Sequence, residues 1–117
     1  MDTGLISSRY ADSLLQYAVN LDQQDEVYDR MKLLSEMFMK MPALRRAMMN
    51  PSVPAGDKKK ILVTACGGSM PSSLSRMTDL ILRNEREENL QYIVLRFIDL
   101  YREKFNIQRG KLVTAVA

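Results

Sequence analysis

Apolar residues recur at helical spacing along most of the chain. In residues 6–21 one apolar stripe contains Ile6, Tyr10, Leu14, Tyr17 and Leu21, and a second stripe beside it contains Ala11, Leu15 and Ala18. Together the stripes cover about half of the helix circumference, whereas a helix lying on a core usually shows a stripe a little wider than about 100°. This stretch therefore predicts a helix with more apolar surface than one core contact requires.

The same spacing predicts five further helices. We expect helices at about residues 7–20, 25–40, 42–49, 56–65, 72–83 and 87–106. Pro- and Gly-containing stretches such as "NPSVPAGD" and "GGSMPSS" separate neighbouring helices. The predicted core stripes are Val27, Met31, Leu34, Phe38 and Met41 in the second helix, and Leu90, Val94, Phe97, Tyr101 and Phe105 in the sixth. Ile93, Ile98 and Leu100 support the latter stripe.

The fifth predicted helix repeats the excess apolar width of the first. Leu74, Met77, Leu80 and Ile81 make one face, which Thr78 and Leu82 extend. Two explanations are open. The extra width is buried between several neighbours inside a bundle, or it receives a helix from a partner. Periodicity alone favours the first explanation.

The pattern changes after Gly110, where "KLVTAVA" is rich in β-branched residues and predicts a strand. A lone strand has no partner in a helical chain. We therefore expect an all-α six-helix domain at residues 1–110, followed at 111–117 by the first strand of a β-containing domain that is missing here. The chain is then expected to be the front part of a longer protein.

Composition excludes most kinds of catalytic site. Among 117 residues there is no His, one Cys and a formal net charge of +3. Without His the commonest general base and metal ligand is missing, and a single Cys cannot build a standard structural zinc site. Cys66 is therefore expected to be a buried, inert thiol. We predict no catalytic, cofactor-binding or metal-binding residues, and a soluble intracellular domain because no signal peptide or bilayer-spanning run is present.

Two short stretches leave an alternative function open. "DKKK" at residues 57–60 is the only basic run, which we interpret as a solvated face rather than a phosphate-binding patch. A helical nucleic-acid-binding or regulatory interaction module using these lysines is the alternative function. In the Met-rich stretch "MFMKM", Met37 and Met41 suit core packing better than an adaptable binding groove, and Met39 is expected to be exposed.

Several landmarks together resemble one known family. "RYADSLLQYA" opens the first helix, "NPSV" follows the third, "LILRNERE" ends the fifth, and "FIDLYREKFN" lies in the last helix before "GKLVTAVA". In order and spacing these resemble the delta subunit of the bacterial F-type ATP synthase, the family that includes the mitochondrial oligomycin sensitivity-conferring protein. The resemblance covers nearly the whole chain.

The resemblance implies a non-catalytic stator subunit located peripherally at the cytoplasmic face of the bacterial inner membrane. In that family a six-helix N-terminal domain sits on top of the catalytic head and holds the N-terminal helix of an alpha subunit between its first and fifth helices. A β-containing C-terminal domain binds the b subunit of the peripheral stalk. The stator resists rotor torque, so that proton flow is coupled to ATP synthesis. Neither nucleic acid nor a cofactor is implied, and contact with the membrane is only indirect, through the complex.

Position by position, the resemblance implies a partner-binding set on these two helices. The residues are Tyr10, Ala11, Leu14, Leu15, Ala18, Met77, Leu80, Ile81, Asn84 and Arg86. An Asp at Leu14 or Leu80 is then expected to abolish binding and leave the fold unchanged. At the junction "NER", Glu85 stands where the family commonly has Gly. We expect Asn84 to take the left-handed conformation there, because Asn tolerates it better than Glu.

Overall fold

The computed structural model describes residues 3–105, and within that range it contains six α-helices and one 3₁₀ helix but no strand. The elements are α1 (Thr3–Asn20), α2 (Gln24–Lys40), α3 (Pro42–Met49), α4 (Ala55–Ala65), α5 (Ser72–Arg83), the 3₁₀ helix η1 (Glu87–Asn89) and α6 (Leu90–Lys104). The predicted all-α fold is confirmed. The predicted strand and second domain at residues 111–117 lie outside the described residues.

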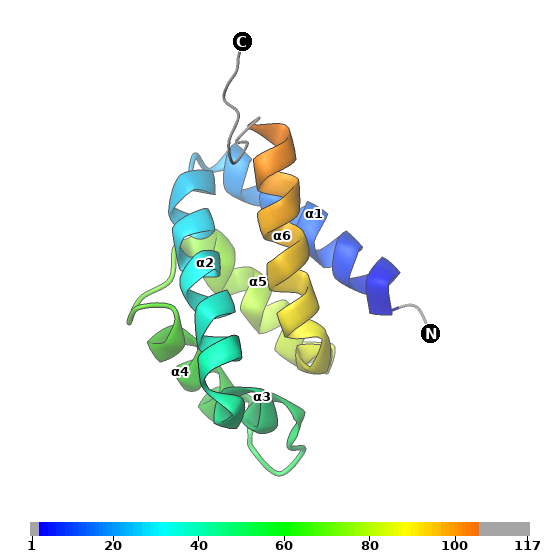
Figure 1. Ribbon diagram of the computed structural model, residues 1–117, viewed down its shortest axis with the longest axis vertical. Coiled ribbons are helices and arrows are strands. Elements are labelled where there is room, and N and C mark those ends of the chain that lie inside the picture. The colour runs from blue at the N-terminus through cyan, green and yellow to red at the C-terminus, as the bar shows by residue number, and fades with distance from the viewer. Residues whose placement is uncertain (1–2, 106–117) are drawn as a thin grey trace.

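The bundle is organised around α6. This helix packs most extensively against α1 and then against α2, which runs beside it (Figure 1). α1 also packs against α5, and α5 packs against α4. α3 and α4 lie at the end of the bundle away from the described end of α6 (Figure 1). The first and fifth helices are therefore neighbours.

The core is aliphatic and Met-rich, with one face of each long helix turned inward. Ile93, Val94 and Phe97 of α6 are completely buried, as the stripe in that helix predicts. Met41 and Phe105 were expected in the core stripes, but the structure leaves them 45% and 38% exposed. Both residues follow the last residue of their helix, so the helical periodicity no longer directs their side chains inward.

Helix ends are built by backbone turns and one side-chain cap. The turn after α1 has Asp22 at φ of 57°, and the turn after α4 has Gly67 at φ of 107°. At α5 the Gln23 side chain caps the N-terminus from the turn between α1 and α2. Its Oε1 accepts hydrogen bonds from the backbone N–H of Ser73 at 2.9 Å and from the Ser73 hydroxyl at 2.7 Å. This cap fixes the start of α5 against the end of α1.

An aromatic cluster joins α2 to α6. The Tyr28 and Tyr101 rings stack with centroids 3.9 Å apart. Burial raises the pKa of Tyr101 to about 12, and the hydrogen bond that its hydroxyl donates to Asp25 acts in the same direction. Since Tyr101 titrates well above neutral pH, this contact keeps its hydroxyl proton under ordinary conditions.

Candidate functional site

A groove of about 290 Å³ lies between α1 and the C-terminal half of α5. Its lining residues are Ile6, Arg9, Tyr10, Ser13, Met77, Leu80 and Arg86. Ile6, Tyr10 and Leu80 are half-buried, so their apolar surface is open to solvent on the groove side. Ile6 and Tyr10 are four residues apart on α1 and therefore stand one above the other on the same helix face. The lining thus offers apolar anchors with basic side chains beside them.

A hydrogen bond across the groove holds its two walls together at one end. The Asn84 side-chain amide donates to the Tyr10 hydroxyl at 2.9 Å, joining residues that are 74 positions apart in the chain. The structure therefore brings these two predicted site residues together. Arg86 lies at the same end, because it follows Asn84 by two residues.

Half of the predicted partner-binding set lies beneath this groove and not in its surface. Ala11, Leu14 and Ala18 are completely buried, and Leu15 and Ile81 nearly so. Their surface is covered by the other helices of the bundle, chiefly α6 against α1. This part of the excess apolar width on α1 is explained by burial between several neighbours. Met77 is almost buried as well, yet it still lines the groove.

The burial of Leu14 corrects one expected test. An aspartate at a completely buried position would place a charge in the apolar core, which destabilises the whole fold. A loss of binding in Leu14→Asp would therefore not report on the groove. Leu80, which lines the groove and is half-buried, remains suitable.

The junction after α5 differs from the sequence expectation. Glu85, not Asn84, takes the left-handed conformation, with φ of 58° against −86° at Asn84. The backbone N–H of Glu85 donates to the Leu82 carbonyl at 3.1 Å, and that of Arg86 donates to the Ile81 carbonyl at 2.9 Å. This pair of bonds is a Schellman motif. The motif requires a positive φ at the residue that precedes Arg86, which is Glu85. The backbone hydrogen bonds thus outweigh the preference of Asn over Glu for the left-handed conformation. The resulting turn places Arg86 in the lining of the groove.

With this geometry defined, comparison with known proteins identifies the family. A family model described as "ATP synthase delta (OSCP) subunit" matches residues 6–117. The chain belongs to this family.

Relatives in the delta family cover nearly all of this chain. It is 42% identical over 115 residues to the ATP synthase subunit delta of Phocaeicola vulgatus, covering 97% of this chain and 62% of that protein. It is 41% identical over 118 residues to the same subunit of Bacteroides thetaiotaomicron, with 99% and 63% covered. The chain therefore spans less than two thirds of the length of these relatives. No solved structure matches it.

Two lysines of the basic run in this delta-family chain form ion pairs within the molecule. The Nζ of Lys58 lies 2.6 Å from Glu87 Oε2 and donates to the Met48 carbonyl at 3.1 Å, and its side chain is 4% exposed. Lys59 pairs with Asp79 at 2.6 Å. The expectation of a solvated face is wrong for Lys58, because its ammonium group is buried against the Glu87 carboxylate. Glu87 lies 29 residues later in the chain, so the local sequence pattern does not indicate this pairing. Of the three lysines only Lys60 is exposed, which counts against the nucleic-acid alternative.

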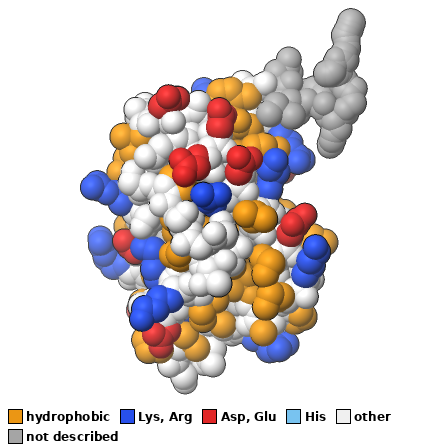
Figure 2. All heavy atoms as spheres, turned by 90° about the vertical axis from the view of Figure 1, so that its left-hand side faces the viewer, with side chains coloured by type: hydrophobic (Ala, Val, Ile, Leu, Met, Phe, Trp, Pro, Cys, Tyr) orange, Lys and Arg blue, Asp and Glu red, His pale blue; other side chains and the backbone are white. Residues whose placement is uncertain are grey.

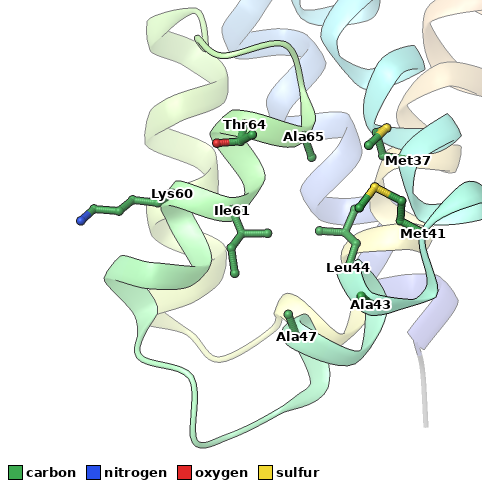
Figure 3. A pocket seen from close by; sticks show the side chains of 9 residues that line it. All are labelled: Met37, Met41, Ala43, Leu44, Ala47, Lys60, Ile61, Thr64 and Ala65. Atoms are coloured by element: carbon green, nitrogen blue, oxygen red, sulfur yellow. The ribbon is translucent and has the colours of Figure 1, made fainter.

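A second, mainly apolar hollow lies between α2, α3 and α4. It has a volume of about 440 Å³, and its walls include Met37, Met41 and Ile61. Leu44 and Ile61 point toward each other across it, while Lys60 points away (Figure 3). Hydrophobic side chains also gather in the lower part of the face shown in Figure 2. Met37 packs against the core as expected, although it also lines this hollow. Met41 is 45% exposed, contrary to the core expectation, whereas Met39 is 75% exposed as predicted.

The groups that could carry chemistry are few in residues 3–105. Cys66 is completely buried, as predicted, and burial raises the pKa of its thiol, so the reactive thiolate is disfavoured. In this range no three His, Cys, Asp or Glu side chains gather as a metal site would require. None of the described helices is long and apolar enough to cross a membrane. The α1–α5 groove is the candidate site because five residues of the predicted set line it or bridge it.

Sequence reasoning missed three lining residues of that groove. Ile6 stands in the apolar stripe of α1 but is not in the predicted partner-binding set, and Arg9 and Ser13 are polar residues that the apolar pattern does not select. The i, i+3 and i+4 spacing of Ile6, Arg9, Tyr10 and Ser13 was a usable signal. It shows that these residues share one edge of the helix, next to the stripe that the core covers.

Proposed function

We propose that the chain works as a non-catalytic stator subunit of an F-type ATP synthase. In this proposal its helical domain holds the N-terminal helix of an alpha subunit in the α1–α5 groove. A later part of the protein binds the peripheral-stalk b subunit and thereby links the stalk to the catalytic head. The complex is then located at the cytoplasmic face of the bacterial inner membrane, with this subunit peripheral. Family membership and the names of the relatives support this role.

The observation that carries the proposal is the half-buried apolar lining of the α1–α5 groove. Ile6, Tyr10 and Leu80 expose apolar surface on two adjacent helices, and the family resemblance assigns its partner helix to the same two helices. Recognition of a helix in a groove needs apolar anchors spaced at i, i+3, i+4 and i+7 on the partner. Leu14 and Ala11 of the same helix are completely buried and fix α1 in the core.

A titration with a synthetic peptide of the alpha-subunit N-terminus tests the proposal. We expect binding to the chain with a negative heat-capacity change, because apolar surface leaves water. Leu80→Asp should weaken binding by at least about 30-fold, as loss of a central anchor costs about 2 kcal/mol or more. Isothermal titration calorimetry measures both quantities.

The matched control is Met39→Asp, which places the same charge on an exposed apolar residue of α2 away from the groove. It should bind the peptide as the parent chain does. Circular dichroism and thermal unfolding of all three proteins verify that the helices remain. Equal peptide affinity in Leu80→Asp and Met39→Asp would contradict the groove assignment.

A further inference from the structure

The α1–α5 groove carries charge of one sign at one end. Arg9 of α1 and Arg86 of the junction both line it, and none of the seven lining residues is acidic. Neither guanidinium makes a hydrogen bond or ion pair with another residue in the range 3–105. Both side chains are exposed. Their charges are therefore available to a partner.

The two arginines lie at the same end of the groove. The Tyr10–Asn84 hydrogen bond joins the residue after Arg9 to the residue two positions before Arg86. The opposite end, near Ser13 and Met77, has no charged lining residue. The groove is thus electrostatically asymmetric along its length.

Among the described residues, no carboxylate pairs with either arginine. On α1, the Asp12 carboxylate accepts a hydrogen bond from Gln16 at 3.0 Å. On α5, Asp79 is paired with Lys59 at 2.6 Å. Glu85, Glu87 and Glu88 line a different hollow together with Lys58. Each of these described carboxylates therefore bonds to another residue or faces another hollow.

We propose that Arg9 and Arg86 select a partner helix that carries carboxylates beside its apolar stripe, at the end that docks next to Tyr10 and Asn84. This inference rests on the proposed function, because it concerns the helix bound in that groove. A guanidinium matches a carboxylate with two parallel hydrogen bonds, which fixes direction as well as distance. The apolar anchors give the affinity, and the arginine pair sets the orientation and register of the bound helix.

A charge cycle tests the inference. The double variant Arg9→Gln/Arg86→Gln should bind the alpha N-terminal peptide about tenfold more weakly than the parent chain at about 0.05 M salt. A second peptide, with every Asp and Glu replaced by Asn and Gln, should bind the parent and the double variant equally. Affinity of the parent for the unmodified peptide should fall as salt is raised to about 0.5 M, while that of the double variant should change little.

The control is Arg45→Gln, which removes an exposed charge on α3, away from the groove. It should not alter affinity for either peptide. If the double variant binds the unmodified peptide as tightly as Arg45→Gln does, with an unchanged salt response, the inference is overturned. In that case the Leu80→Asp result still decides the proposed function separately. If the peptide binds Leu80→Asp as tightly as it binds the parent chain, both the inference and the proposed function are overturned.

Discussion

Glu85 shows how a single residue can adopt a conformation that its side chain disfavours. Its φ of 58° is left-handed, and this conformation costs an L-residue with a side chain about 1–2 kcal/mol. Two backbone hydrogen bonds that end α5 require this conformation at residue 85. Asp22 occupies the equivalent position after α1, and Asp tolerates the region better. The backbone strain at Glu85, which lies just before Arg86, is therefore greater than the strain at Asp22.

Glu85→Gly should stabilise the chain. Gly adopts positive φ without steric cost, and after its greater backbone entropy in the unfolded state is deducted we expect a gain of about 0.5–1 kcal/mol. The free energy of unfolding in urea measures this gain. Asn84→Gly is the matched control, since residue 84 has φ of −86° and its side chain bonds to Tyr10. It should be destabilising, and an equal effect from both substitutions would contradict the role assigned to the backbone conformation.

At the scale of elements, the helices could be predicted from sequence because their signals are local. Apolar spacing, Pro before or within a first turn and Gly after a last turn gave the bounds of α3 and α5 correctly and those of α2 and α4 within one residue. α1 begins four residues earlier than predicted, and the start of the sixth helix is the separate turn η1. Which stripe of α1 faces the core depends on α6, about 80 residues later, so periodicity alone could not assign it. The destination of Lys58 depends on Glu87 in the same way.

Lys58 joins three elements, since it lies on α4 and bonds to Met48 of α3 and to Glu87 of η1. Lys58→Met should cost about 3 kcal/mol of unfolding free energy, because it leaves a largely buried carboxylate without its cation. Denaturant unfolding measures this loss. Lys59→Met is the matched control: it removes a more exposed ion pair and should cost about 1 kcal/mol or less. If the two substitutions cost the same, the buried pair is not an anchor of these elements.

For the whole molecule, the candidate site could be predicted as a pair of helices but not as a surface. The resemblance selected α1 and α5, and Tyr10, Met77, Leu80, Asn84 and Arg86 of the predicted set line the groove or bridge it. The remaining predicted residues are covered by the bundle itself, which only the three-dimensional packing reveals. The packing also creates a second apolar surface between α2, α3 and α4, so apolar character alone does not decide where a helix docks.

Chemical-shift mapping of the chain by NMR, with the alpha N-terminal peptide added, separates the two surfaces most directly. We predict that the largest amide shifts fall on the α1–α5 groove, at Ile6, Tyr10, Leu80 and Arg86. Residues of the other hollow, such as Met37 and Ile61, should change little, because they lie on different helices. Shifts concentrated at Met37, Met41 and Ile61, with the α1–α5 groove unchanged, would contradict the central claim.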